Sequence, residues 1–256
     1  MLIAYTRPVS PTLAECELTH LERSPIDVDR ASDEHAAYEQ VLRDLGVSVT
    51  QLPAEPRLPD AVFVEDTAVV LDKVAVITRP GAASRRPETR TVEAALAVHR
   101  PLVHIRAPAT LDGGDVLVTA GRRIYVGLST RTSADAVEQL AALLWPYDYE
   151  VIAAPFKGCL HLKSGVTEVR DELVLLNPEW VDPAVFKHHR ALSVDPSEPH
   201  AANALAIHGA VIHPRHHSRT RARLVAEGLR VLTVEQTELA KAEAGVTCCS
   251  LIVRVD

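Results

Sequence analysis

Thr247-Cys248-Cys249-Ser250-Leu251-Ile252-Val253-Arg254-Val255-Asp256 is the last stretch of the sequence, and it decides the fold. Two adjacent cysteines precede an apolar run that is typical of a β-strand. Similar openings occur earlier in the chain, and each of those continues into a second strand, a polar loop, an amphipathic helix and a further strand. The last copy stops after its first strand, so we expect another part of the chain to supply the missing pieces.

An internal repeat therefore organises the sequence. Its openings recur roughly every 40 to 50 residues, a period typical of propellers and solenoids. The earlier openings are Phe63-Val64-Glu65-Asp66-Thr67-Ala68-Val69-Val70, Leu111-Asp112-Gly113-Gly114-Asp115-Val116-Leu117-Val118, His161-Leu162-Lys163-Ser164-Gly165-Val166 and Ala201-Ala202-Asn203-Ala204-Leu205-Ala206. The second strands are predicted at 74–78, 124–127, 172–176 and 210–213, and the helices at 88–98, 133–144, 183–192 and 219–229.

The N-terminal segment carries what the last copy lacks. Residues 2–5 predict a strand, residues 29–45 a helix with apolar residues four apart, and residues 47–52 a further strand. If the two ends of the chain pair, a ring of five units closes and no sheet edge is left open. We therefore predict an α/β fold, a five-bladed α/β propeller closed by N- and C-terminal strands, as a single domain over residues 1–256.

Composition limits the kinds of partner that the protein can have. Hydrophobic residues make up 47% and charged residues 24%, the balance of a globular protein, and a net charge of -7 argues against a nucleic-acid surface. No window of about 18 apolar residues predicts a membrane span. The first residues lack the basic-then-apolar order of a signal peptide, and four cysteines in 256 residues suit a reducing compartment. We expect a cytoplasmic protein that binds neither nucleic acid nor membrane.

Closure of the ring would bring polar residues from all five openings to one axis. A cysteine, a histidine and several carboxylates at one centre can supply a nucleophile, an acid/base and groups that bind a cation. Alternation along a strand lets only one of two adjacent cysteines face the axis, so the other is expected in the core. The residues expected at the axis are Glu65, Asp66, Asp112, Asp115, His161, Asn203 and either Cys248 or Cys249.

Other interpretations of the same residues stay open. A lone cysteine is more often a small hydrophobic core residue than a nucleophile. A zinc site could use the cysteine, the histidine and two carboxylates, but the chain has neither CxxC nor HExxH spacing, so no metal is predicted. Gly113-Gly114 lacks the context of a phosphate loop and is expected to form a tight turn that needs glycine's backbone freedom. Arg85 and Arg131 either clamp a substrate carboxylate or lie on a solvated surface.

Six motifs follow one another in a recognisable order: Leu58-Pro59-Asp60-Ala61-Val62-Phe63-Val64-Glu65-Asp66, Ile77-Thr78-Arg79-Pro80-Gly81-Ala82 with Ser84-Arg85-Arg86, Leu111-Asp112-Gly113-Gly114-Asp115-Val116-Leu117, Val126-Gly127-Leu128-Ser129 with Arg131-Thr132, Leu160-His161-Leu162-Lys163-Ser164, and Thr247-Cys248-Cys249-Ser250. As a set they resemble the dimethylargininases, the Nω,Nω-dimethylarginine dimethylaminohydrolases. That family belongs to the guanidine-modifying, or pentein, superfamily, whose fold is a five-bladed α/β propeller. The resemblance is collinear from Asp27 to the C-terminus.

The resemblance implies a role for each of the matching residues. Cys248 would be the nucleophile with Cys249 as its buried neighbour, and His161 would be the general acid and then the general base. Asp112 would orient either His161 or the substrate guanidinium. The implied substrate-binding residues are Asp66 with Glu65 for the guanidinium, Asp60, Arg85 and Arg131 for the amino-acid end, and Leu18 and Ala242 for contacts at a lid and at the backbone, Leu18 lying in the long loop 7–27.

The implied reaction converts dimethylarginine or monomethylarginine to citrulline plus dimethylamine or methylamine through a covalent thiouronium intermediate, without a cofactor. One residue separates this chain from the arginine deiminases, which it also resembles. They have an aspartate two residues after the catalytic histidine, where this chain has Lys163. The loss of that carboxylate favours a methylated guanidinium. Alternatives are a hydrolase of arginine, hydroxyarginine or citrulline, and a non-catalytic pentein that binds arginine-like ligands; a homodimer is possible.

Overall fold

Five three-stranded sheets build the fold in the computed structural model, which describes residues 1–255 and leaves Asp256 outside the described residues. Every sheet has its first two strands antiparallel and its last two parallel, which confirms the predicted repeat. In this order the sheets are β15 (Leu251–Arg254), β1 (Leu2–Thr6) and β2 (Ser48–Gln51); β3 (Ala68–Val70), β4 (Ala75–Ile77) and β5 (Leu102–His104); β6 (Val116–Thr119), β7 (Arg123–Gly127) and β8 (Glu150–Ala154); β9 (Val166–Arg170), β10 (Leu173–Leu176) and β11 (Arg190–Ser193); and β12 (Leu205–Ile207), β13 (Ala210–Pro214) and β14 (Arg230–Val234).

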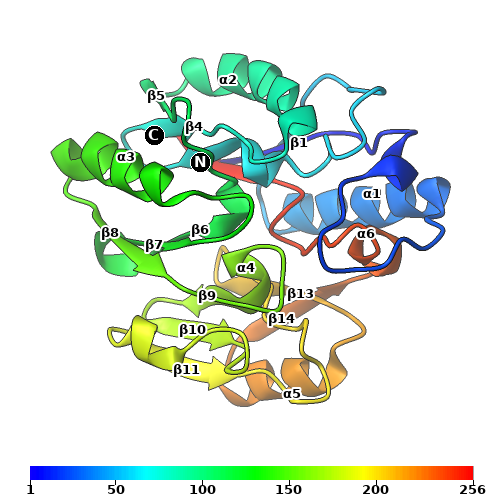
Figure 1. Cartoon of the computed structure of the whole chain (residues 1–256). Helices are drawn as coiled ribbons and strands as arrows, with labels where there is room; N and C mark the ends of the chain where they lie inside the picture. Colours follow the sequence, from blue (N-terminus) through cyan, green and yellow to red (C-terminus); the bar gives the residue numbers. More distant parts are fainter. Residues whose placement is uncertain (256) are drawn as a thin grey trace.

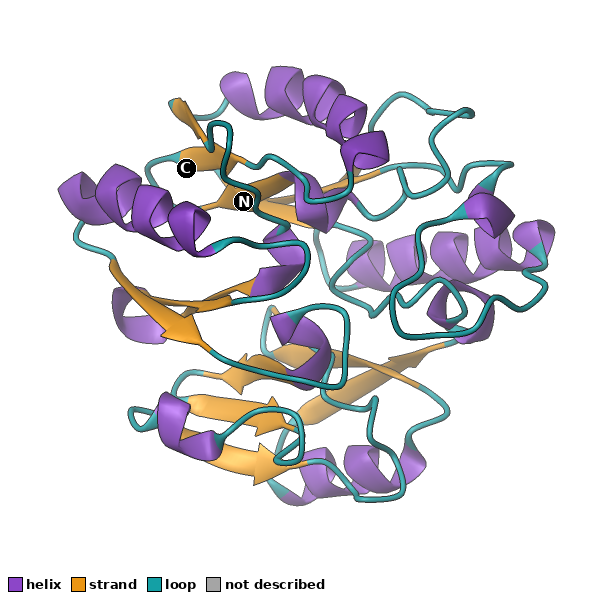
Figure 2. Cartoon of the chain, in the orientation of Figure 1, coloured by secondary structure: helices purple, strands orange, loops and turns teal. Residues whose placement is uncertain are grey.

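A helical segment connects the two parallel strands of each sheet, as parallel pairing requires. In chain order these connections are α1 (Val28–Asp44), α2 (Thr89–Ala97), α3 (Ala134–Leu144), the 3-10 turn η7 (Pro183–Phe186) and α5 (Ser218–Ala226). The four α-helices among them lie around the outside of the molecule, and the strands lie inside them (Figures 1 and 2). None of the helices in residues 1–255 combines the length and the apolar character needed to cross a membrane.

Shorter helical segments make up the rest of the regular structure, and most of them stand at strand ends. They are α4 (Leu162–Gly165) and α6 (Thr237–Ala240), together with the 3-10 turns η1 (Leu13–Glu15), η2 (Val64–Thr67), η3 (Ala83–Glu88), η4 (Gly113–Asp115), η5 (Ala120–Arg122) and η6 (Trp145–Tyr147). The turns η2, η4 and α4 fall on three of the predicted openings. Each therefore leads directly into the first strand of its sheet.

The two ends of the chain close the ring as predicted. Strand β1 pairs antiparallel with β15, with Ile3 opposite Val253 and Tyr5 opposite Leu251. The first strands of neighbouring sheets also touch, β15 against β3 and β9 against both β6 and β12. These strands form the inner wall of the propeller, so the segments that precede them meet at its centre.

Helix α1 shows how local sequence fixes one of these units. The Asp27 carboxylate caps its N-terminus by accepting a hydrogen bond from the Arg30 N–H at 3.0 Å. Gly46, at φ +79°, follows its last turn in the left-handed conformation that glycine adopts most easily. Tyr38 and Leu42 face inward, into the core cluster that also contains Cys248 and Cys249.

Two details of the sequence interpretation were wrong. The helix predicted over residues 183–192 is only the short turn η7, and Arg190–Ser193 forms strand β11 because it pairs with β10. The paired cysteines do not alternate along a strand, because they lie in a turn that precedes β15. That the chain forms a single catalytic domain stays a prediction.

Candidate active site

A small cavity lies where the openings meet, and it contains most of the predicted site residues. Its free volume is about 10 Å³, room for roughly one water molecule. The predicted residues that line it are Asp60, Asp66, Arg85, Arg131, His161, Ala242 and Cys248. Three predicted residues are absent from its described lining. Leu18 packs against the core cluster that contains Cys248, Glu65 lines a different cavity, and Asp112 contacts His161.

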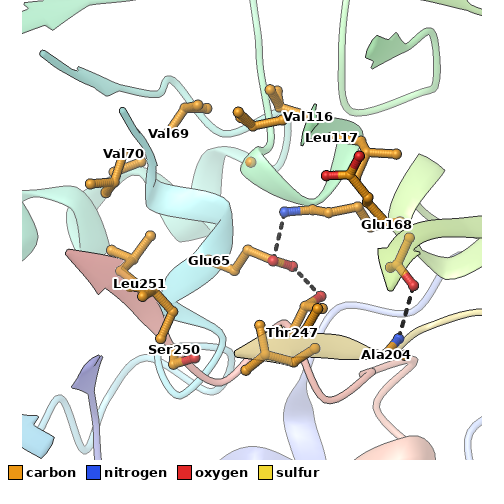
Figure 3. Close-up of a pocket in the computed structure, with 18 of the residues that line it drawn as sticks. Glu65, Val69, Val70, Val116, Leu117, Glu168, Ala204, Thr247, Ser250 and Leu251 are labelled. Carbon is orange, nitrogen blue, oxygen red and sulfur yellow. Dashed lines mark hydrogen bonds and ion pairs between the residues drawn. The ribbon is translucent and has the colours of Figure 1, made fainter. Parts of the chain in front are cut away.

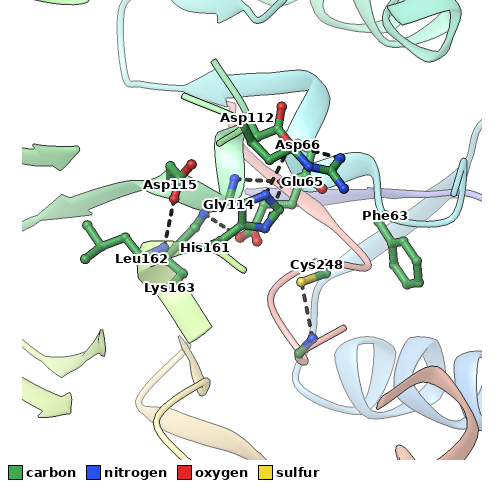
Figure 4. A network of polar contacts seen from close by, with 12 residues as sticks. Phe63, Glu65, Asp66, Asp112, Gly114, Asp115, His161, Leu162, Lys163 and Cys248 are labelled. Atoms are coloured by element: carbon green, nitrogen blue, oxygen red, sulfur yellow. Dashed lines mark hydrogen bonds and ion pairs between the residues drawn. The ribbon is translucent and has the colours of Figure 1, made fainter. Parts of the chain in front are cut away.

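His161 stands between two carboxylates. Its Nε2 lies 3.1 Å from Asp112 Oδ2, and its Nδ1 lies 3.7 Å from Asp66 Oδ1 (Figure 4). Burial by itself would lower the pKa of this imidazole, but the surrounding carboxylates of Asp66, Asp112 and Asp115 outweigh it and raise the pKa to about 9. His161 is therefore an imidazolium at neutral pH, the form that a general acid needs.

Gly114 permits this arrangement by its lack of a side chain. A Cβ at this position would lie 2.5 Å from His161 Nδ1 and 2.7 Å from Asp66 Oδ1. Gly113 is equally confined, because a Cβ there would lie 2.0 Å from the Glu65 carbonyl oxygen. Neither glycine has a positive φ. The expected reason for the pair, backbone freedom in a turn, was thus wrong: the two glycines are needed for close approach.

Asp66 is held by Arg85 from the neighbouring turn η3. Arg85 Nη1 donates to Asp66 Oδ2 at 2.5 Å, and its Nε and Nη2 donate to the Glu88 carboxylate. Burial would raise the pKa of Asp66, but His161 and Arg85 outweigh it and hold that pKa well below its usual range. Asp66 is therefore ionised at neutral pH. Most N–H donors of Arg85 are already hydrogen-bonded to protein groups.

Cys248 reaches the cavity from the turn before β15. Its side chain is 9% exposed, and its Sγ accepts a hydrogen bond from the Gly245 N–H at 3.3 Å. Burial and the carboxylates of Glu65 and Asp66 raise the pKa of the Cys248 thiol well above its ordinary value. Cys249 is 2% exposed and belongs to the core. The free protein thus holds Cys248 as a thiol beside a cavity of negative charge.

Glu65 and Lys163 form an ion pair near the centre of the ring, on the other side of the small cavity. Lys163 Nζ donates to Glu65 Oε1 at 2.6 Å, and Thr247 Oγ1 donates to Glu65 Oε2 at 2.9 Å (Figure 3). All three residues line a larger rear cavity of about 380 Å³. Neighbours in sequence therefore face opposite sides, Glu65 the rear and Asp66 the front. Binding of a guanidinium by Glu65 itself stays a prediction.

Two residues predicted to bind the amino-acid end of a substrate contact the loop between β1 and α1. The N–H of Glu17 donates to both Asp60 carboxylate oxygens, at 3.3 and 3.2 Å. Arg131 Nη2 donates to Thr19 Oγ1 at 3.2 Å. Leu18, between these two residues, packs partly buried against the core cluster that contains Cys248. The loop covers the cavity as a lid would.

Sequence reasoning missed several lining residues. Phe63 and Leu160 belong to the motifs that contain predicted residues, so their position in a motif could have indicated them. Glu17, Glu243 and Ala244 lie in a loop and a turn without periodicity, and no sequence signal marks them. Asp115, expected at the axis, accepts the Leu162 N–H at 2.9 Å and so fixes the start of α4 beside His161.

One cluster among residues 1–255 could hold a metal ion by its geometry. Ligand atoms of Asp66, Asp112 and His161 all lie within 4.8 Å of one another. Contacts between the imidazole and the two carboxylates already account for this closeness. That the protein works without a metal stays a prediction.

Known proteins resemble the chain in sequence. A model of the eukaryotic N,N dimethylarginine dimethylhydrolases matches residues 19–192. The N(G),N(G)-dimethylarginine dimethylaminohydrolase of Streptomyces coelicolor is 39% identical over 98% of this chain and 96% of its own. The protein of the same name from Pseudomonas aeruginosa is 34% identical, over 88% and 89%. The chain belongs to the dimethylarginine dimethylaminohydrolase family.

Solved structures agree with this membership. A cysteine-to-serine variant of the Pseudomonas aeruginosa family member, complexed with citrulline, has a TM-score of 0.93 at 32% identity and covers 98% of both chains. A histidine-to-glycine variant of a dimethylarginine dimethylaminohydrolase, as an adduct with S-methyl-L-thiocitrulline, has a TM-score of 0.92 at 32% identity. The N-terminal domain of a cyanobacterial arginine dihydrolase, at 18% identity and a TM-score of 0.89, shares the fold.

Proposed function

We propose that this protein hydrolyses Nω-methylated L-arginines to L-citrulline and an alkylamine. The observation that carries the proposal is the juxtaposition of a thiol, Cys248, and an imidazolium, His161, in one small cavity whose lining includes several carboxylates. A cationic guanidinium is the ligand that such a cavity attracts. Membership of the dimethylarginine dimethylaminohydrolase family supports the same substrate class.

The first half of the reaction forms a carbon–sulfur bond. A bound guanidinium offsets the negative charge near Cys248, which lowers the thiol pKa and releases its proton to solvent. The thiolate attacks the guanidinium carbon and gives a tetrahedral adduct. His161 then donates a proton to the methylated nitrogen, the carbon–nitrogen bond breaks, and the alkylamine leaves. A thiouronium attached to Cys248 remains.

The second half of the reaction breaks the carbon–sulfur bond. His161, now neutral, takes a proton from a water molecule that attacks the thiouronium carbon. Collapse of the adduct breaks the carbon–sulfur bond and expels the Cys248 thiolate. The hydroxyl loses its remaining proton to solvent, the carbonyl of citrulline forms, and the thiolate is reprotonated from solvent. Asp112 orients His161 throughout, and Asp66 binds the guanidinium. Asp60 and Arg131 bind the α-ammonium and α-carboxylate with support from Arg85, while Leu18 and Ala242 contact the same end. Each charge-assisted hydrogen bond contributes roughly 1.5 to 3 kcal/mol.

The deciding experiment incubates purified protein with asymmetric dimethylarginine and measures citrulline and dimethylamine in equal amounts. Cys248→Ser, with a weaker nucleophile of similar size, should form neither product. Citrulline formation by the wild-type protein at only the rate of this variant contradicts the proposal. A thiouronium adduct on the Cys248 peptide, trapped by acid and detected by mass spectrometry, excludes a protein that only binds arginine-like ligands. Activity that disappears with a chelator indicates a metalloenzyme instead.

A second candidate, hydrolysis of arginine, hydroxyarginine or citrulline, is tested by comparing kcat/KM across these compounds and the methylarginines. The contact between Lys163 and Glu65 favours the methylated substrates. Lys163 stands where the arginine deiminases have an aspartate, and it also neutralises the Glu65 carboxylate, so fewer negative charges are left to bind an unmethylated guanidinium. We expect the methylarginines to have the highest kcat/KM. A homodimer and a cytoplasmic location are further expectations, for light scattering and cell fractionation to check.

A further inference from the structure

Glu243 binds three consecutive backbone N–H groups of the lid loop, residues 7–27. Its carboxylate accepts from Thr19 at 3.0 Å, from His20 at 2.5 Å and from Leu21 at 2.6 Å. Glu243 itself lines the small cavity beside Cys248. One side chain of the turn after α6 therefore fastens residues 19–21 of the lid loop, which follow Glu17, a residue that lines the cavity.

The backbone at Glu243 is held in a costly conformation. Its φ is +58°, a region that a glutamate rarely adopts. Such strain persists only where the surroundings compensate for it. The three hydrogen bonds to the lid loop are one such compensation. They give a physical reason for a glutamate at a position that glycine would occupy more easily.

Two other lid contacts use groups that the substrate needs. The Glu17 N–H occupies the Asp60 carboxylate, where the substrate α-ammonium is expected, and the Thr19 hydroxyl occupies Arg131, where the α-carboxylate is expected. Substrate must displace both contacts. The Glu243 contact involves no group assigned to the substrate, so it can persist while the other two exchange.

We propose that Glu243 is a positioning residue, which fastens the lid loop at Thr19, His20 and Leu21 while substrate replaces the loop at Asp60 and Arg131. Residues 19–21 then stay bound to Glu243 while the rest of the lid loop closes over the substrate. The substrate part of this inference rests on the proposed function. The tether itself can be tested without turnover.

Glu243→Gly is the most informative variant. It removes the carboxylate, and it should melt within about 3 °C of the wild type because glycine adopts a positive φ freely. Glu172→Gly is the matched control, since Glu172 has a φ of +60° in an exposed turn between β9 and β10. Iodoacetamide labelling of the Cys248 peptide, followed by mass spectrometry, measures how often the lid opens. We expect labelling about tenfold faster in Glu243→Gly, from the loss of partly exposed hydrogen bonds, and unchanged in the control.

Kinetics with asymmetric dimethylarginine provide the second readout. Glu243→Gly should raise KM several-fold and change kcat less, because the variant must order the lid on binding. Glu243→Gln, which keeps the length and one acceptor oxygen, should restore part of the wild-type KM. The proposal is wrong if the Cys248 peptide of Glu243→Gly is labelled at the wild-type rate, or if Glu172→Gly accelerates the labelling equally. If Glu243→Gly melts much lower, the labelling rate of Glu243→Asn decides in its place, because asparagine tolerates a positive φ and its shorter side chain cannot reach the three N–H groups in the same way. A wild-type protein that does not turn over asymmetric dimethylarginine contradicts the proposed function. If its Cys248 is still labelled more slowly than that of Glu243→Gly, the role of Glu243 in holding the loop is nevertheless supported.

Discussion

Three central carboxylates each lie against a different cationic side chain. Glu65 pairs with Lys163, Asp66 with Arg85, and Asp112 with His161. Only the last pair includes a group that can exchange a proton near neutral pH. The other two pairs supply fixed charge and shape. Among these three pairs, His161 is therefore the group that can transfer a proton.

Removal of Lys163 from its ion pair with Glu65 should lower the free energy of unfolding. Lys163→Met leaves Glu65, whose side chain is 10% exposed, without its cation. Breaking a buried pair on one side costs about 3 kcal/mol, because an unpaired charge stays buried. Urea unfolding at pH 7 measures this loss. The double variant Glu65→Gln/Lys163→Met should recover most of the stability, and a single variant as stable as the wild type would contradict the prediction.

The raised pKa of His161 predicts a pH-dependent stability. Its pKa is about 9 in the folded protein against an ordinary 6.5, so its stabilisation is complete below pH 6.5 and is lost as pH rises toward 9. The wild type should lose more unfolding free energy over this range than His161→Gln. Asp112→Asn removes a neighbouring negative charge and should lower the pKa, read from the His161 ring signals by NMR. A titration near 6.5 in the wild type contradicts the prediction.

At the scale of elements, the turn that carries the cysteine depends on how α6 is anchored. The Glu34 carboxylate, on α1, accepts hydrogen bonds from the N–H groups of Thr237, Glu238 and Leu239, and from the Thr237 hydroxyl. Glu34 is 4% exposed and replaces the missing partners of the first turn of α6. The chain continues from α6 through Ala242 and Glu243 to Cys248. Helix α1 therefore positions the active-site turn from behind.

Glu34→Ala should disturb this anchor. Several buried donors lose their acceptor, which we expect to cost about 3 kcal/mol of unfolding free energy. Asp33→Ala is the control, because Asp33 is exposed on the same helix and should change stability by no more than about 0.5 kcal/mol. Chemical denaturation compares the two variants. Equal stability of both would show that the contacts to α6 contribute nothing.

For the whole molecule, closure of the ring joins the two ends of the described chain. The Met1 N-terminus donates to the Val255 carbonyl at 2.7 Å, and the Val255 N–H donates to the Met1 carbonyl at 2.9 Å. Strand β1 has β15 on one side and β2 on the other. The sheet of β15, β1 and β2 is thus complete only because the ends meet, whereas each of the other four sheets comes from one contiguous stretch of chain. Cys248 lies a few residues before this closing strand, so closure also fixes the position of the proposed nucleophile.

A circular permutant tests this closure. Joining the termini with a short Gly/Ser linker and cutting the exposed tip between Gly121 and Arg122 should leave the urea midpoint and the activity near wild type, because no sheet changes. Deleting residues 251–256 should instead abolish cooperative unfolding, because β1 loses its partner and the core loses buried Leu251 and Val253. A cooperative truncated protein would contradict the prediction.

The sequence by itself determined the repeat and its closure by the two ends. It also predicted His161 and one of the two adjacent cysteines at the centre, and the family resemblance favoured Cys248. Strand and helix periodicity and a motif order are local properties, so they can be read along the chain. The tertiary structure decided the partners of those residues. Lys163 meets Glu65 across 98 positions and Leu21 meets Glu243 across 222, separations at which no periodicity operates. It also decided that Glu65 and Asp66 face opposite cavities, and that residues 190–193 form a strand, because sheet pairing outweighs the local helical pattern.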